Sequence, residues 1–214
     1  ANNILNIFHG KAFIKEEATE SNFKKHASDY NILHLAMHTI IDDNEPGYSK
    51  LIFNQEAGHA EDGFLHTSEL FNLELHSKMA VLSACKTGYG KLNKGEGIMS
   101  LARGFIFAGI PSIVMTLWSV EDRTSADLMS NYYERLNKGL RKNVALREAK
   151  LEHLKTSSPI TAHPHFWAGY VIIGDTNPIS QTHPYAFIYI IIAAILMAVS
   201  LLYFLRKKKH QKQN

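Results

Sequence analysis

The sequence is nearly devoid of cysteine: Cys85 is the only one among 214 residues. A lone thiol cannot form an intrachain disulfide, so the fold must depend on its apolar core. Cys85 is therefore either a packed side chain or a reactive group, and its sequence neighbourhood has to decide which. The chain also lacks internal repeats and low-complexity tracts. It begins with Ala1 and not with Met, which leads us to expect a fragment of a longer protein.

The folded part of the chain lacks an excess of positive charge, although the formal net charge is +3. Five basic residues lie within 206–214, a stretch that contains no acidic residue. Without them, 18 basic side chains face 20 acidic ones. Nucleic-acid binding usually requires a basic surface, so we expect no nucleic-acid partner.

One segment lacks charge altogether. Residues 185–205 read YAFIYIIIAAILMAVSLLYFL, and about 20 such residues are enough to cross a bilayer as a helix. Tyrosines near both ends suit the two membrane interfaces. We therefore expect a globular domain at 1–176, a linker at 177–184, a single transmembrane helix at 185–205 and a basic tail at 206–214. A buried core helix is the alternative.

The charges that flank this segment predict its orientation. RKKKH follows it directly, whereas the 20 residues before it contain no Lys or Arg. The positive-inside rule then places the tail in the cytoplasm and the globular domain on the periplasmic or exterior side. A tail-anchored protein with a cytoplasmic domain is the alternative, and it would put the basic cluster on the unfavoured side.

Residues 1–176 alternate between short apolar runs and amphipathic stretches, which predicts an open α/β sheet flanked by helices. Helices are expected at 97–108, 123–138 and 143–155. The last of these carries Val144, Leu151 and Leu154, with Ala145 and Ala149 on adjoining positions, and its apolar stripe is expected to lie on the sheet. Strands are expected at 31–36, 50–53, 78–83, 112–116 and 167–173.

Two segments place a reactive side chain just beyond a predicted strand. The run LHLAMH ends at His38, and LSACKTG carries Cys85. Active sites of open α/β sheets collect at the carboxyl ends of strands, so the two side chains meet if these strands are parallel neighbours. An imidazole can take the proton of a cysteine and leave the nucleophilic thiolate. The spacing of His38 and Cys85 is close to that in caspases.

Several sequence blocks, in order, resemble the CHAT domains, bacterial relatives of caspases and separase that often follow tetratricopeptide repeats. The resemblance covers nearly all of residues 5–176. The blocks are ILHLAMH (32–38), DGFL (62–65), VLSACKTG (81–88), GEG (95–97), LARGF (101–105), TLWSVED (116–122), HPHFW (163–167) and IGD (173–175).

The resemblance implies a caspase-like, mostly parallel sheet and a catalytic dyad, with His38 as general base and Cys85 as nucleophile. It also implies an oxyanion hole formed by the backbone N–H groups of Thr39 and Cys85. Many family members have glycine where this chain has Thr39. Because threonine resists positive φ, the local turn here can differ from theirs.

Four acidic residues are candidate substrate contacts: Asp42, Asp43, Glu96 and Asp122. Asp42 and Asp43 can equally be solvated loop residues, and Glu121 and Asp122 can cap the helix that follows them. His34 and His38 are four residues apart, but the segment lacks the glutamate of HExxH and is predicted to be a strand. His34 is interpreted as a strand histidine that supports the site. We therefore expect no metal and no organic cofactor.

The expected function is hydrolysis of peptide bonds in a protein or peptide substrate by a membrane-anchored cysteine endopeptidase. We expect the activity to be gated by a regulatory partner or by an upstream repeat region. Two alternatives remain. One is a non-catalytic interaction or signalling domain with the same fold, and the other is a hydrolase that acts on a non-peptide acyl substrate.

Overall fold

The computed structural model describes residues 2–42, 44–55, 61–83, 96–179 and 197, with side chains of 96–100 excepted. Contact clustering divides the chain into two units, residues 1–180 and 181–214. Within the described ranges, no helix has the length and apolarity needed to cross a membrane. The predicted span at 185–205 lies outside these ranges except for Met197.

The first unit is built on a four-stranded sheet with the order β1-β5-β6-β7. β1 (Ile32–Leu35), β5 (Met79–Leu82) and β6 (Ser112–Thr116) are parallel, and β7 (Tyr170–Gly174) is antiparallel to β6. The expected mostly parallel α/β sheet is thus confirmed.

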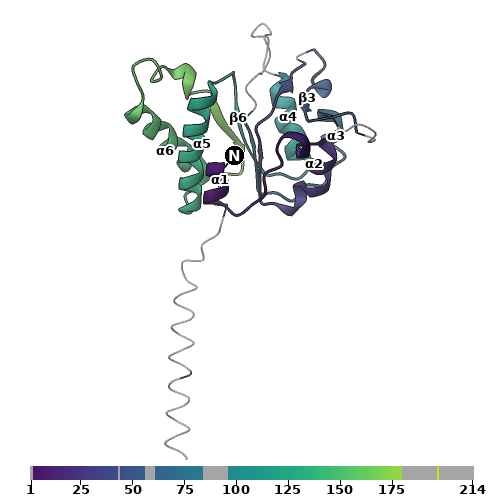
Figure 1. Ribbon diagram of the computed structural model, residues 1–214, viewed down its shortest axis with the longest axis horizontal. Coiled ribbons are helices and arrows are strands. Elements are labelled where there is room, and N and C mark those ends of the chain that lie inside the picture. The colour runs from purple at the N-terminus through teal and green to yellow at the C-terminus, as the bar shows by residue number, and fades with distance from the viewer. Residues whose placement is uncertain (1, 43, 56–60, 84–95, 180–196, 198–214) are drawn as a thin grey trace, which may run out of the picture. The chain divides into compact units, whose positions relative to one another are not determined.

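Helices cover both faces of this sheet (Figure 1). One face carries α2 (Glu20–His26), α3 (Thr67–Leu70) and α4 (Glu96–Phe107), and the other carries α1 (Asn2–Ile7), α5 (Asp122–Asn137) and α6 (Lys142–Thr156). Strand side chains alternate between the two cores: Ala80 and Leu82 face the first, whereas Met79 and Val81 face the second. This alternation makes β5 apolar throughout, as expected of a strand buried on both faces.

A second, antiparallel sheet contains β2 (Thr39–Ile40), β3 (Lys50–Ile52) and β4 (Phe64–His66) in the order β2-β3-β4. The apolar run predicted at 50–53 is therefore a strand, but it belongs to this small sheet and not to the parallel one. Leu51 and Leu65 are fully buried and join the core beneath α4. Short 3-10 turns complete the unit at Lys15–Glu17, Ala27–Asp29, Pro46–Tyr48 and Pro164–Phe166.

The predicted apolar stripe of α6 is confirmed only in part. Val144, Leu151 and Leu154 are each 36–40% exposed, so this part of the prediction was wrong. Ala145 and Ala149, on the adjoining positions, are buried, and Leu146 is buried with them. Small side chains on the buried face allow a neighbouring helix to pack closely. The predicted stripe of α5 is confirmed, since Leu128, Tyr132 and Leu136 are fully buried.

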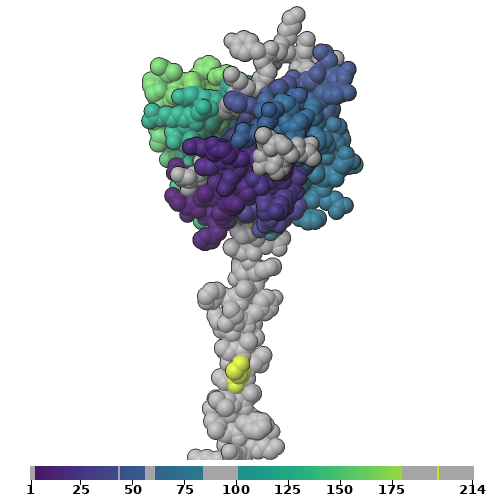
Figure 2. Space-filling model, turned by 45° about the vertical axis from the view of Figure 1, so that its right-hand side comes forward, coloured from purple at the N-terminus to yellow at the C-terminus, as the bar shows by residue number. Residues whose placement is uncertain are grey.

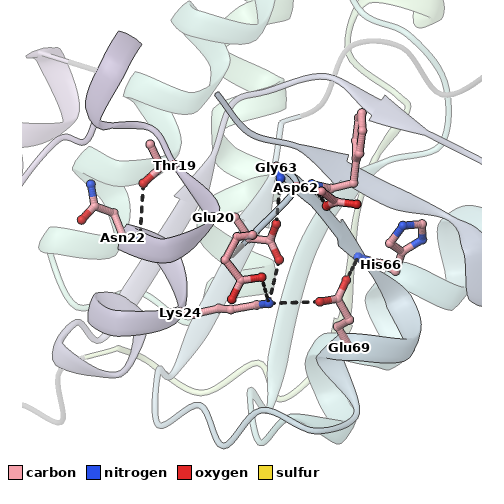
Figure 3. A network of polar contacts seen from close by, with 10 residues as sticks. Thr19, Glu20, Asn22, Lys24, Asp62, Gly63, His66 and Glu69 are labelled. Carbon is pink, nitrogen blue, oxygen red and sulfur yellow. Dashed lines mark hydrogen bonds and ion pairs between the residues drawn. The ribbon is translucent and has the colours of Figure 1, made fainter. Parts of the chain in front are cut away.

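An ion cluster joins α2 to the small sheet (Figure 3). The Lys24 Nζ lies 2.7 Å from Glu20, 2.7 Å from Glu61 and 3.0 Å from Glu69. Glu20 is buried, and its second oxygen accepts a hydrogen bond from the backbone N–H of Gly63 at 3.1 Å. The three carboxylates resemble a metal-ligand set, but the Lys24 ammonium already occupies the position that a cation would take.

Candidate active site

The ends of β1 and β5 lie side by side at one edge of the parallel sheet. Leu35 pairs with Leu82, and the Ser83 N–H donates to the Leu35 carbonyl at 3.0 Å. His38 follows the end of β1 by three residues, and Cys85 follows the end of β5 by the same number. Cys85 itself lies outside the described residues. The parallel, adjacent strands that the prediction required are present.

His38 is exposed and lies where the chain passes from one sheet to the other. Its carbonyl accepts a hydrogen bond from the Ile52 N–H at 2.9 Å, which ties this crossing to β3. The described residues contain no cis peptide bond, so the N–H of Thr39 points opposite to that carbonyl and away from β3. This N–H is therefore not used by the small sheet.

Thr39 adopts ordinary extended backbone as the first residue of β2. Among the described non-glycine residues, only Lys15 has a positive φ. Thr39 is thus a β-branched residue in a conformation that suits a strand. The Thr39 hydroxyl is buried, and it has no hydrogen-bond partner among the described residues.

A cavity of about 790 Å³ opens at this edge of the sheet. His38 and Ser83 line it from the ends of β1 and β5, and Asp122 lines it from the first turn of α5. Asn3 and Ile4 of α1 contribute part of its wall. The structure therefore brings together two of the predicted site residues, His38 and Asp122, beside the strand from which Cys85 follows.

The other acidic residues named from the sequence do not line this cavity among the described residues. The Asp42 carboxylate accepts hydrogen bonds from the backbone N–H groups of Asn44 and Glu45, both at 2.9 Å. The Asp42 carboxylate thus stabilises its own turn, and its role as a substrate contact stays a prediction. Asp43 and the side chain of Glu96 lie outside the described residues. Glu121 precedes α5 and accepts a hydrogen bond from the Thr124 hydroxyl at 2.8 Å, which supports a role at the helix start.

His34 lines the cavity, and its partner on α5 is a residue that sequence reasoning missed. The Nδ1 of His34 lies 2.9 Å from the hydroxyl of the buried Tyr133. Burial lowers the pKa of His34 to about 4, and burial raises the pKa of Tyr133 well above its ordinary value. Both groups are therefore neutral near pH 7, and the tautomer of His34 decides which of them donates the hydrogen bond. The two residues are 99 positions apart, so no local pattern could have paired them.

Two further sequence blocks, at 101–105 and 163–167, make packing or fixing contacts. Leu101, Ala102 and Phe105 are buried in the core. A side chain at Gly104 would lie 2.9 Å from Leu70, so this position keeps α4 close to α3. The block around Trp167 is fixed by a hydrogen bond from its Nε1 to the Ala162 carbonyl at 3.0 Å.

In the space-filling view, the N-terminal residues in purple and blue form most of the visible face, with α5 and α6 beside them (Figure 2).

Comparison with protein families supports the resemblance inferred from these blocks. The model of the CHAT domain matches residues 1–175. The chain belongs to the CHAT domain family. Curated relatives include tetratricopeptide repeat protein 28 of Mus musculus, 32% identical over 111 residues, and its counterpart of Homo sapiens, 31% identical over 111 residues. Each match covers 52% of this chain and only 4% of the relative.

Proposed function

We propose that this CHAT domain is a cysteine endopeptidase in which His38 and Cys85 form the catalytic pair. The observation that carries the proposal is the parallel pairing of β1 with β5. Each strand is followed, three residues later, by one of the two reactive side chains. A substrate-sized cavity at the same edge supports it further. Packing alone does not account for an exposed histidine at this position.

In the proposed reaction, the proton of Cys85 passes to His38, and the thiolate attacks the scissile carbonyl carbon. The tetrahedral oxyanion accepts hydrogen bonds from the N–H groups of Thr39 and Cys85. As the carbon–nitrogen bond breaks, His38 gives its proton to the leaving amine. Water then hydrolyses the thioester: His38 accepts one proton of the water, and the proton returns to the departing thiol. No cofactor takes part.

A cleavage assay tests this proposal. Residues 1–180 form the first compact unit, and Ile179 must be kept because it is buried in the core. This shortened chain is incubated with a diverse peptide library, alongside Cys85→Ala and His38→Ala. We expect cleavage by the parent and a loss of at least about 100-fold in each variant. His76→Ala, at an exposed histidine just before β5, is the matched control and should keep full activity. Cleavage that survives Cys85→Ala would refute the dyad.

A regulatory partner or an upstream repeat region is part of the same proposal. It is supported by the names of the relatives, which are tetratricopeptide repeat proteins. An enzyme that needs an activating partner would show no cleavage in the assay until that partner is added. A non-catalytic interaction domain is the competing function, and the reactivity of Cys85 separates the two without a trigger. Hydrolysis of acyl esters without peptide cleavage would instead point to a non-peptide substrate.

We further propose that residues 185–205 span a membrane, with the basic tail in the cytoplasm and the CHAT domain on the opposite side. The support is the uncharged run of 21 residues and the RKKKH that follows it. The full chain, mixed with vesicles, should float with them through a density gradient after alkaline extraction. A chain ending at residue 180 should stay in the soluble fraction. Recovery of both in the soluble fraction would refute the anchor.

A further inference from the structure

The chain leaves the CHAT domain at the edge of the sheet opposite to the candidate active site. The Asp175 N–H donates to the Pro111 carbonyl at 2.7 Å, just before β6 begins. The Lys78 ammonium, just before β5, donates to the Ile179 carbonyl at 3.2 Å. The buried Lys142 forms an ion pair with Asp175 at 2.9 Å, which also lowers the pKa of that carboxyl. The exit point is therefore fixed on the domain.

An exposed apolar surface lies at this same edge. α4 runs from the end of β5 back to the start of β6, so its last residue, Phe107, reaches the edge where the chain exits. Phe107 is 71% exposed and Phe71 is 43% exposed. Their rings meet edge to face with centroids 5.1 Å apart. Two exposed rings in contact are unusual for a surface in water.

A hollow of about 500 Å³ adjoins this aromatic pair. Its walls include Leu73, Phe107 and Pro111, and its rim includes Glu74 and Lys78. Lys78 and Pro111 also hold the outgoing chain. The aromatic pair, the hollow and the exit thus form one continuous surface, which we call the exit face.

We propose that the exit face, through Phe71 and Phe107, contacts the headgroup region of the bilayer that the chain itself spans. This inference rests on the proposed membrane anchor. Only five residues separate Ile179 from Tyr185, where the uncharged run begins. The six steps from Ile179 to Tyr185 reach about 20 Å when fully extended, so the exit face cannot lie far from the membrane surface.

The chemistry of the exit face suits the interfacial region of a bilayer. Aromatic side chains favour that region, and apolar faces typically enter it by about 5–10 Å. Glu74 and Lys78 at the rim favour a wet headgroup layer over the hydrocarbon core. The contact would direct the opposite edge, with His38 and its cavity, away from the membrane. Substrates would then be proteins or peptides outside the bilayer.

Site-directed labelling of the full chain in vesicles tests this inference. Cys85→Ala removes the only thiol, and Phe107→Cys in this background takes an environment-sensitive fluorophore. The matched control is Ile160→Cys, which is 74% exposed and lies beyond the end of α6, toward the edge that carries the cavity. The vesicles contain phosphatidylcholine with a nitroxide at the headgroup or at a shallow acyl position. A third label, Phe71→Cys, checks that the result does not depend on position 107 alone.

We expect the nitroxide lipids to quench the labels at 107 and 71 at least about threefold more than the label at 160. Equal quenching at all three positions, in chains that float with the vesicles, would overturn the inference and leave the anchor intact. Strong quenching at 160 alone would show the opposite orientation and also overturn it. Chains that do not float would refute the anchor and, with it, this contact.

Discussion

At the scale of single residues, one wall of the cavity is a histidine whose pKa is lowered by burial. The Nδ1 of His34 lies 2.9 Å from the hydroxyl of the buried Tyr133. Its position four residues before His38 gave it a supporting role at most in the sequence, and its partner on α5 could not be predicted. The direction of β1 places His34 near the end of the strand. Tyr133 comes next to it only because α5 packs on the sheet.

The low pKa of His34 predicts an acid-sensitive fold. Its pKa is about 4 in the folded chain, below its ordinary value of 6.5. The unfolded chain therefore binds a proton more readily between these values, and the stability that His34 contributes is lost as the pH falls through this window. In urea unfolding, the shortened chain should lose more stability between pH 7.5 and 5 than its His34→Gln variant.

The exposed His76 provides the control for that comparison. His76→Gln should lose as much stability between the two pH values as the parent does. If His34→Gln and the parent show the same loss, burial of a neutral His34 does not contribute to stability.

At the scale of elements, the ion cluster fastens α2 to α3 through Glu69 and to the segment before β4 through Glu61. Burial alone would lower the pKa of Lys24, but hydrogen bonds to Glu20, Glu61 and Glu69 outweigh it and raise that pKa. Burial raises the pKa of Glu20 despite its lysine partner. The cluster thus depends on one ammonium group that stabilises a buried carboxylate.

Lys24→Met should destabilise the domain by roughly 2–4 kcal/mol at pH 7.5, because it leaves the Glu20 carboxylate buried without its cation. The loss should shrink at pH 4.5, where protonation removes the charge of Glu20. Urea unfolding at both pH values measures this. Lys25→Met, at the exposed neighbouring position, should change stability by less than about 0.5 kcal/mol. A loss for Lys24→Met that does not depend on pH would contradict the account.

The turn between α4 and β6 depends on a glycine. Gly109 has φ +106°, and a side chain there would lie 2.5 Å from the Leu75 carbonyl oxygen. Gly109→Ala should therefore cost at least about 2 kcal/mol in thermal or urea unfolding. Gly47, which has open space around it, gives the matched control: Gly47→Ala should be close to neutral. Equal effects of the two substitutions would show that the turn relaxes freely.

Element types were predictable where a long periodic pattern existed. The observed bounds of α4, α5 and α6 differ from the predicted ones by a single residue, and the strand at 112–116 matches β6. It was harder to predict which face of each helix is buried. Val144, Leu151 and Leu154 looked like the buried stripe of α6, yet alanines face the core. Two- and three-residue strands such as β2 and β4 lack any period, and only their partners define them.

At the scale of the whole molecule, the two edges of the parallel sheet carry different features. One edge carries His38, the cavity and the segment that leads to Cys85. The other carries the exit of the chain and the exposed aromatic pair. The sequence predicted the first edge because reactive residues followed two apolar runs. It did not predict the second, because Phe71 and Phe107 become neighbours only when α3 and α4 pack together.

The reactivity of Cys85 in the full chain tests the central claim most directly, because it needs neither a substrate nor a trigger. The rate of alkylation by iodoacetamide is measured from pH 5 to 9 for the parent, His38→Ala and the control His76→Ala. If His38 and Cys85 form a pair, the parent and the control should react at pH 6.5 at least about tenfold faster than a free cysteine, and His38→Ala should lose this advantage. A Cys85 that reacts equally in the parent and in His38→Ala, or only above its ordinary pKa of about 8.5, would contradict the dyad and favour a non-catalytic interaction domain.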